Sequence, residues 1–351
     1  MAGVFLNGVF SEGFDHTTTT SQIFTANAAG TISSSFARFA AQANAVSQGW
    51  QSGNNFSNLG LGVQLPSVIV NAAFQAPSFP LGGNNNIIQL LDSTVGQFGT
   101  TQVSLGYNSG GNLVVLRGAS VIATSVLTIA PLAYYHVQFK VTINASGLAE
   151  VRVNGNATPW ISFSGNTQNT ANAFTDAVGM GGSQLLMDDW TMQDTTGTAP
   201  LNDYLGDKKI ITFLPNNDSA TGGLNQFSTQ PSRSAGSHYL NVNANPPVDT
   251  NYNFDSTVND RESYRFPSIA QASGVISWVN GKARLWKDDA ASRSVAIVAR
   301  NNAVDTVGTT NIMPSTPTYF ANPFPNDPNT AAAWTIAGWN GGAEMGVKII
   351  S

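Results

Sequence analysis

The chain has 351 residues, of which 10% are charged; Lys and Arg total 15, Asp and Glu total 20, and the formal net charge is -5. An ordinary soluble domain carries roughly 25% charged residues. Because nucleic-acid backbones and anionic membranes are bound through clustered cations, this composition argues against both as partners.

Other compositional features describe a folded chain without thiol chemistry. Aromatic residues make up 10% of the sequence, whereas disordered segments are poor in aromatics and usually strongly charged. There is no cysteine, so disulfides, thiolate catalysis and cysteine-bound zinc are excluded. The length allows two domains of roughly 150 residues, each with its own core.

Neither a secretory leader nor a membrane span is expected. Residues 1–16 lack a basic region followed by a continuous apolar stretch, which a leader would need. The longest apolar-leaning run, residues 121–135, is interrupted by Thr124, Thr128 and Pro131. It is also shorter than the about 20 apolar residues of a membrane helix.

The first quarter of the chain contains a long stretch without charge. No Asp, Glu, Lys or Arg occurs between Arg38 and Asp92. Clusters of Val, Ile and Phe alternate there with Gly, Asn and Ser, which is typical of strands and turns. The stretch predicts either a buried sheet or contact surface, or a sheet solvated by its Asn, Gln and Ser side chains. A helix is indicated only over residues 36–46, and without a firm cap.

Alternation with a period of two is the dominant signal further along. Val137, Phe139 and Val141 share one face of a strand predicted over residues 136–143, and a second half-buried strand follows over residues 148–155. The intervening NASG has the residues of a hairpin turn. Similar patterns predict strands at residues 87–92, 102–107, 112–118 and 121–127.

A passage rich in turn residues, 187–207, predicts a loop that leaves this first set of strands. We place a domain boundary there, with a first domain over residues 1–198 and a second over residues 199–351. In the second domain, short strands are predicted at residues 208–215, 262–268, 274–286, 294–300, 318–322 and 343–350. Many short strands between Gly, Pro and Asn turns indicate an all-β fold of two antiparallel β-sandwich, jelly-roll-like domains.

The three histidines give little support for catalysis. A hydrolase would need paired carboxylates or a set of Ser, His and an acid. His136 lies in an alternating strand and is predicted to be an ordinary surface or cross-strand residue. His16 follows Asp15 near the start of the chain, and His238 lies beside a turn. Neither is distinguished as a metal ligand or a base.

Two pairs of neighbouring acids are weighed as metal ligands. Adjacent side chains on a strand point to opposite faces, but a loop relaxes this restriction. Asp188 and Asp189 could therefore join backbone carbonyls in an oxygen-ligated Ca²⁺ site, since calcium accepts about 6 to 8 oxygens in flexible geometry. The alternative is that they cap turns or pair with Arg or Lys. Asp288 and Asp289 are expected at an exposed hairpin tip. No other cofactor is expected.

The tryptophans are the most suitable residues for stacking on sugars, although most are expected to be core or interface residues. We name Trp160 and Trp190 of the first domain as candidate glycan-binding residues. The seven are Trp50, Trp160, Trp190, Trp278, Trp286, Trp334 and Trp339.

Two longer stretches carry a family resemblance. YYHVQFKVTINASGLAEVRVNGN at residues 134–156, followed by LLMDDWTMQD at residues 185–194, resembles the laminin-G-like, concanavalin A-like lectin sandwich. NDYLGDKKIITFLPNNDS at residues 202–219 and the ending AAAWTIAGWNGGAEMGVKI resemble virion proteins of tailed bacteriophages, in which such a sandwich precedes a second β-rich domain. The E-x-D-x-x-E strand of glucanases that share this sandwich is absent, which argues against inherited hydrolysis.

The resemblance implies a non-enzymatic virion structural protein of the capsid exterior, neck or tail, whose partners are other virion proteins and copies of itself. A neutral surface rich in Asn, Thr and Ser suits wet, hydrogen-bonded interfaces. The alternative is an adhesin that binds host surface glycan through loops of the first domain. A polysaccharide-cleaving enzyme is a third hypothesis, disfavoured because no suitably spaced carboxylate pair is evident.

Overall fold

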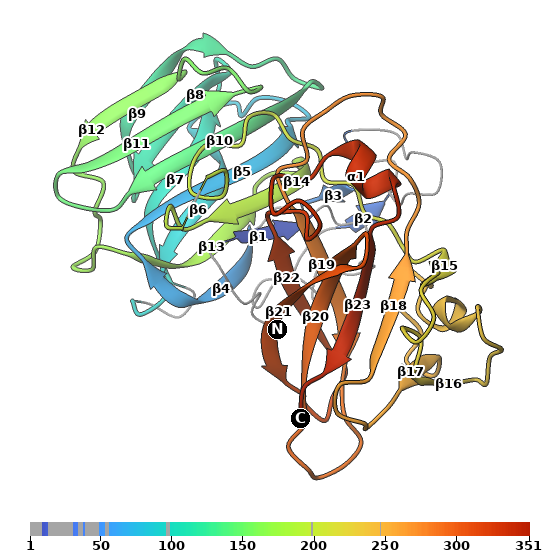
Figure 1. The fold of residues 1–351 in the computed structure, drawn as a ribbon. Helices are drawn as coiled ribbons and strands as arrows, with labels where there is room; N and C mark the ends of the chain where they lie inside the picture. The colour runs from blue at the N-terminus through green and yellow to red at the C-terminus, as the bar shows by residue number, and fades with distance from the viewer. Residues whose placement is uncertain are drawn as a thin grey trace. The chain divides into compact units, whose positions relative to one another are not determined.

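A computed structural model describes residues 9–12, 31–33, 38, 49–52, 56–95, 99–197, 199–245 and 247–351. These residues form two compact units that divide after residue 211 (Figure 1). No helix in these ranges is long and apolar enough to cross a membrane. His16 and the helix expected over residues 36–46, apart from Arg38, lie outside the described residues.

The first unit consists of two antiparallel sheets. One sheet contains β1 (Val9–Glu12), β2 (Thr31–Ser33), β3 (Gly49–Gln51), β5 (Ser67–Gln75), β10 (Tyr134–Thr142), β11 (Gly147–Val153), β12 (Ile161–Gly165) and β14 (Leu186–Gln193). The other contains β4 (Phe56–Leu65), β6 (Asn84–Asp92), β7 (Thr100–Asn108), β8 (Asn112–Arg117), β9 (Ser120–Thr128) and β13 (Thr175–Gly181). The strand orders are β12-β11-β10-β5-β14-β3-β2, with β1 also on β14, and β4-β13-β6-β7-β8-β9.

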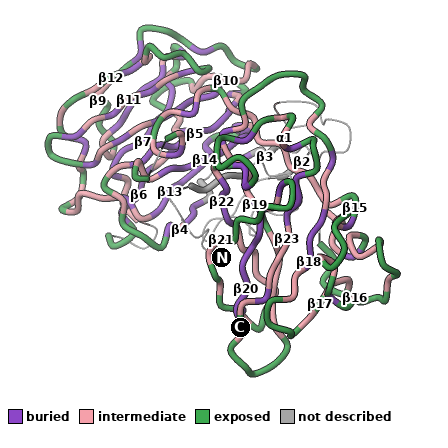
Figure 2. The backbone as a smooth tube through the Cα atoms, viewed as in Figure 1, coloured by how far each residue is buried: buried purple, intermediate pink, exposed green. Residues whose placement is uncertain are grey.

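The core of the first unit lies between these sheets, and Figure 2 shows buried residues running along the strands. Val137 and Phe139 of β10 and Val70 of β5 point into it from one sheet, and Leu105 and Val178 from the other. Each such side chain contributes about 1.5–3 kcal/mol when it leaves water. The predicted hairpin is confirmed, since β10 and β11 pair antiparallel with Val137 opposite Val153.

The charge-free stretch forms β3, β4, β5 and most of β6 where it is described. β5 is buried along nearly its whole length, because it lies in the interior of its sheet between β10 and β14. The interpretation as a buried sheet therefore holds for β5.

The prediction of a loop over residues 187–207 is wrong for its first residues. They belong to β14, which is an interior strand of the larger sheet. Asp188 lies opposite Ala73 and Thr191 opposite Asn71, so two residues of β14 oppose one residue of β5 in a β-bulge. Asp189 in the bulge has a φ of 52°. A bulge reorients the side chains at its position. The adjacent acids Asp188 and Asp189 can therefore have the same neighbours although they follow each other on one strand.

Residues 199–211 belong to the first unit rather than to the second. The Gln193 side chain on β14 donates a 2.9 Å hydrogen bond to the Leu201 carbonyl. The Tyr204 ring lies 3.7 Å from the Arg152 guanidinium carbon, and the Lys140 ammonium is 5.2 Å from the same ring. Because this segment is bound to the outer face of the larger sheet, the strand expected at residues 208–215 does not form.

The second unit has a five-stranded antiparallel sheet in the order β15-β18-β23-β20-β21. Its strands are β15 (Asn217–Asp218), β18 (Arg261–Arg265), β20 (Ser294–Asn301), β21 (Val304–Ile312) and β23 (Glu344–Ile349). Two strand pairs, β16 (Ser228–Gln230) with β17 (Tyr252–Phe254) and β19 (Val279–Leu285) with β22 (Thr318–Phe324), complete it together with the short helices η3 (His238–Asn241) and α1 (Ile336–Asn340).

Tryptophans dominate the core of the second unit, which contains Ile297, Met345 and Phe324 besides Trp334 and Trp339. The Trp334 indole donates to the Phe324 carbonyl at 2.9 Å, so its polar atom is satisfied inside the core. The indole of Trp339 is likewise satisfied, by a backbone carbonyl at 3.0 Å. The prediction of an all-β chain built from antiparallel sandwiches is confirmed.

Candidate functional site

A polar groove with a volume of about 450 Å³ lies on the six-stranded sheet of the first unit. Alternation along β6 places Gln89 on the outer face, because Ile88 and Leu90 point into the core. Leu116 of β8 faces outward for the same reason, next to the core residue Val115. The groove is lined by Asn84, Asn86, Gln89, Thr100, Thr101, Leu116, Gly118, Ala119 and Asn169.

A glycine lets the groove floor pack closely. Gly106 of β7 lies opposite Asn86. A Cβ atom added to Gly106 would lie 2.7 Å from the Asn85 carbonyl oxygen and 3.0 Å from Asn86 Oδ1. Any larger residue would therefore displace the Asn86 amide, which lines the groove.

Several polar side chains in the groove have unused hydrogen-bonding capacity. The side chains of Asn84, Gln89 and Thr101 make no hydrogen bond with the described residues, and Asn86 Oδ1 accepts only a long one, 3.5 Å, from Ser104. An amide carries two donors and an acceptor. These groups are therefore free to bind water or a polar ligand.

Asn169 is held at one end of the groove by a buried glutamine. The Gln102 Oε1 atom accepts hydrogen bonds from the backbone nitrogens of Asn169 and Thr170 at 2.7 and 3.0 Å. The Asn169 amide donates to the Thr101 carbonyl at 2.8 Å. Gly118, with a φ of +56°, leaves space for this amide, because a Cβ there would lie 2.7 Å from Asn169 Nδ2.

A buried acid holds the same loop from the end of β6. Asp92 Oδ2 accepts hydrogen bonds from Thr170 Oγ1 at 2.6 Å and Asn172 Nδ2 at 3.0 Å, and Oδ1 accepts from Thr94. Burial alone would raise the pKa of Asp92, but the hydrogen bonds from Thr170, Thr94 and Asn172 outweigh it and lower the pKa. The carboxylate is therefore a structural anion that positions the loop.

The residues that line the groove are all neutral. None of its lining residues is ionisable. A general acid or base must lie within hydrogen-bond reach of the proton it transfers. Amides and hydroxyls arranged along strands can instead exchange hydrogen bonds with a hydroxylated ligand.

Asp188 and Asp189 lie elsewhere, on the larger sheet, and both are buried. Asp188 accepts a 2.8 Å hydrogen bond from the Arg38 backbone nitrogen, and Asp189 lies 3.5 Å from the Arg38 guanidinium and accepts from the Ile210 nitrogen at 2.8 Å. Burial raises the pKa of Asp189 to about 6, although Ile210 and Arg38 act to lower it.

The pairing of these acids with Arg is thus seen directly. Among the residues that the structure describes, no three His, Asp or Glu side chains gather in a way that could hold a metal ion. The calcium site at Asp188 and Asp189 stays a prediction.

His136 is buried on the same sheet and lies opposite Ala73 of β5, so of the two expected placements it is a cross-strand residue and not a surface residue. Its Nδ1 atom has no hydrogen-bond partner among the described residues. Burial lowers the pKa of His136 to about 4; Asp207 acts to raise it and Arg38 to lower it further. The imidazole is therefore neutral at physiological pH.

The two candidate tryptophans have different environments. Trp190 is 0% exposed and belongs to the core. Its expected role in stacking on a sugar is wrong, because a fully buried ring presents no face to a ligand. Trp160 is half-buried and lies edge-on to Tyr135, with ring centroids 6.4 Å apart. Its role in glycan binding stays a prediction.

In the second unit, His238 has a partner that its sequence context does not indicate. Its Nδ1 atom lies 2.9 Å from Oε1 of the buried Glu262. Asp288 and Asp289 are exposed, as expected, and Asp289 pairs with Arg293 at 2.8 Å.

None of the groove residues is a candidate on sequence grounds. The one available signal is the strand predicted at residues 87–92, in which Gln89 alternates with apolar neighbours and so must face outward. Asn169 and Gly118 carry no comparable signal, because the loop and the turn that hold them join the groove only through tertiary contacts.

In comparisons with known proteins, no family model and no curated protein matches the chain. Solved structures with related folds include a Trypanosoma rangeli sialidase, at 16% identity and a TM-score of 0.33 over 43% of this chain and 26% of that one. An alginate lyase matches at 13% identity and a TM-score of 0.33, over 54% of this chain and 97% of that one. An endo-β-1,4-glucuronan lyase from the fungus Trichoderma reesei matches at 10% identity and a TM-score of 0.37, over 57% and 95%.

These comparisons correct the expected function. The chain spans about a quarter of the sialidase, and at such TM-scores the likeness assigns no activity or residue role to this protein. The proteins named are glycan-processing enzymes and not virion components. The expectation of a non-enzymatic bacteriophage structural protein that acts through assembly contacts is therefore contradicted.

Proposed function

We propose that the first unit binds neutral glycan chains in the polar groove of its six-stranded sheet and does not cleave them. The observation that carries this proposal is a groove of about 450 Å³ lined by amide and hydroxyl side chains and by no ionisable residue. Sugars offer dense arrays of hydroxyls that both donate and accept, and the amides of Asn84 and Gln89, which make no hydrogen bond with the described residues, offer the same capacity.

The shape of the groove suits an oligosaccharide better than a single sugar. Asn84 and Gln89 lie opposite Asn108 and Ser104, which are four positions apart on β7, because β6 has a bulge after Asn86. This corresponds to roughly 14 Å along a strand. The groove then continues to Thr101 and Asn169 at its far end. Ala119, which is exposed, supplies apolar surface for the C–H groups of a sugar ring.

The absence of charge in the lining favours neutral ligands. An acidic glycan would need a cation to offset the desolvation of its carboxylates, and the groove lining offers none. This distinguishes the proposed ligand from the sialic acid, alginate and glucuronan of the enzymes named above.

A glycan array probed with the full chain tests the proposal, once with Ca²⁺ and once with a chelator. Hits among neutral oligosaccharides are expected, and the double variant Asn86→Ala/Gln89→Ala should lower their affinity about tenfold or more, as expected when two ligand hydrogen bonds are lost. Gln64→Ala is the matched control, because this exposed amide on β4 does not line the groove.

Three results would overturn the proposal. Unchanged binding by the double variant would remove the groove as the site. Hits confined to acidic glycans would contradict the ligand class. Release of shorter products from a bound polysaccharide would show that the protein is an enzyme.

A further inference from the structure

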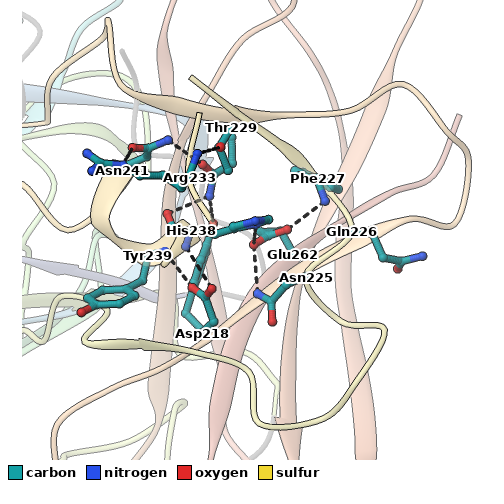
Figure 3. A network of polar contacts seen from close by, with 12 residues as sticks. Asp218, Asn225, Gln226, Phe227, Thr229, Arg233, His238, Tyr239, Asn241 and Glu262 are labelled. Atoms are coloured by element: carbon teal, nitrogen blue, oxygen red, sulfur yellow. Dashed lines mark hydrogen bonds and ion pairs between the residues drawn. The ribbon is translucent and has the colours of Figure 1, made fainter. Parts of the chain in front are cut away.

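In the second unit, a network of polar side chains holds one face of the two-stranded ribbon β16–β17 (Figure 3). Thr229 of β16 accepts a 2.7 Å hydrogen bond from the Arg233 nitrogen, and Arg233 Nε donates to Asn241 Oδ1 at 2.8 Å. Asn253 of β17 donates to the His238 carbonyl at 3.1 Å. The side chains on this face of the ribbon are therefore committed to internal contacts.

Glu262 connects the same network to the five-stranded sheet (Figure 3). Its carboxylate is 0% exposed and lies 2.9 Å from each of three partners, His238 Nδ1, Asn225 Nδ2 and the Phe227 backbone nitrogen. The segments before and after β16 are thus attached to β18. This attachment fixes the orientation of the ribbon within the second unit.

The opposite face of the ribbon is partly exposed. Tyr252 and Phe254 are two positions apart on β17 and share this face, and Phe254 is 50% exposed. Their cross-strand partners are Gln230 and Ser228. Both partners are exposed, and their side chains make no hydrogen bond with the described residues. This face therefore combines aromatic rings with unpaired polar groups.

A tryptophan from another strand pair extends the aromatic surface. The Trp286 ring, just after β19, lies 5.4 Å from the Tyr252 ring at 72°, and the Phe254 ring lies 5.8 Å from Tyr252 at 62°. The three rings meet edge to face in a stepped row, with Tyr252 in the middle. Aromatic pairs favour this geometry, and it makes the row rigid.

An ion pair lies beside this row along the chain. Arg284, two positions before Trp286, donates through Nε and Nη2 to the two carboxylate oxygens of Asp249, both at 2.7 Å. The pair has no net charge. Its carboxylate retains lone pairs and its guanidinium retains N–H groups that can bind hydroxyls.

We propose that the partly exposed face of the ribbon, formed by Tyr252, Phe254, Ser228 and Gln230 and extended by Trp286, is a second site for neutral glycan, at which sugar rings stack on the aromatic row. A sugar ring has an apolar C–H face and hydroxyls at its edge. It can therefore cover Phe254 and Tyr252 while it hydrogen-bonds Ser228 and Gln230. This site is separate from the groove and does not depend on it.

The polar groups on this face distinguish a glycan from an apolar protein partner. An apolar protein surface that covered the rings would also bury the Ser228 hydroxyl and the Gln230 amide without partners. A buried unpaired polar group is costly, whereas glycan hydroxyls satisfy both.

The test measures binding of the full chain to insoluble cellulose, chitin and β-1,3-glucan by co-sedimentation. The groove variant Asn86→Ala/Gln89→Ala serves as the background, so that the second site is observed alone. Residual binding to at least one polysaccharide is expected, and Phe254→Ala should weaken it about tenfold, the usual order for loss of a stacked ring. Ser228→Ala/Gln230→Ala should weaken it less. Val304→Ala, an exposed apolar residue on β21, is the control.

Two results would overturn this proposal without affecting the groove. One is binding that Phe254→Ala leaves unchanged. The other is self-association of the chain in sedimentation velocity that Phe254→Ala abolishes, because a second copy would then occupy the face. Loss of all binding in the groove variant, with wild-type binding intact, would likewise remove the second site and leave the first.

Discussion

Asp92 and Thr170 connect the end of β6 to the loop before β13 through a 2.6 Å hydrogen bond from the Thr170 hydroxyl to Asp92 Oδ2. The residue next to Thr170 is Asn169, which lines the groove. A buried carboxylate thus positions the loop that carries an amide of the groove lining, although it does not itself line the groove.

We expect Asp92→Asn to reduce both stability and glycan affinity. The amide keeps the size of the carboxylate but replaces one acceptor oxygen with a donor that faces Thr170 and Asn172. The free energy of unfolding should fall by about 1–3 kcal/mol, the usual range for a mispaired buried group. Urea denaturation and calorimetric titration with a neutral oligosaccharide measure the two effects; full affinity in the variant would show that the loop is held without Asp92.

The pH dependence of this interaction follows from the lowered pKa of Asp92, whose ordinary value is 3.8. A lowered carboxyl pKa means that the unfolded state binds the proton more readily. The stabilisation is therefore complete above pH 3.8 and is lost as the pH falls through the folded-state pKa. Asp92→Asn should lack this acid-dependent component, which stability measurements between pH 2 and pH 5 would detect.

His136 and Asp189 should have opposite effects on stability between about pH 4 and pH 6. The pKa of Asp189 is raised to about 6 from 3.8, so its favourable contribution is complete below pH 3.8 and is lost as the pH rises to 6. The pKa of His136 is lowered to about 4 from 6.5, so its contribution is complete above pH 6.5 and is lost as the pH falls to 4. In the wild type the two contributions therefore change stability in opposite directions as the pH changes.

Single substitutions should therefore reveal how stability depends on pH through each group. His136→Phe should lose stability as the pH rises from 4 to 6, and Asp189→Asn should gain it, each by about 1 kcal/mol per pH unit. Chemical denaturation of the full chain at several pH values measures this. Parallel pH profiles for the two variants would contradict the assignment.

Gly118→Ala should affect the groove through a steric contact as well as through backbone strain. An L-residue in the left-handed region costs about 1–2 kcal/mol, and the new Cβ would also approach Asn169 Nδ2 to 2.7 Å. Gly62→Ala is the control, since Gly62 has a φ of +71° and nothing within 4 Å of the added atom. We expect both variants to lose stability and only Gly118→Ala to lose glycan affinity; equal affinities would show that Asn169 is dispensable.

Removal of the Glu262 carboxylate should loosen the ribbon that carries Tyr252 and Phe254. Glu262→Ala removes the partner of His238 and of the Phe227 nitrogen and one of the two acceptors of Asn225, and should destabilise the second unit by about 3–5 kcal/mol. Glu262→Gln keeps one acceptor oxygen and should cost less. Hydrogen–deuterium exchange should be faster in β16 and η3 for the Ala variant; unchanged protection would mean that the ribbon is anchored elsewhere.

The alternation of apolar and polar residues was sufficient to predict most strands, because in a half-buried strand each position is assigned to one face. It was insufficient for β14, where two adjacent acids and a Trp suggest a loop. Those acids are accommodated by a β-bulge and by Arg38, which is distant in the chain. It also failed at residues 208–215, where apolar residues suggest a strand but the segment is held by groups such as Asp189.

The sequence by itself determined the all-β class, the β10–β11 hairpin and the low charge of the chain, because these depend on local alternation, turn residues and composition. Only the tertiary structure decided which residues meet. It buried Trp190 and His136, it brought Asn169 and Gly118 together in the groove, and it paired His238 with Glu262. Such contacts join residues far apart in the chain, and no local pattern of side chains encodes which of them become neighbours.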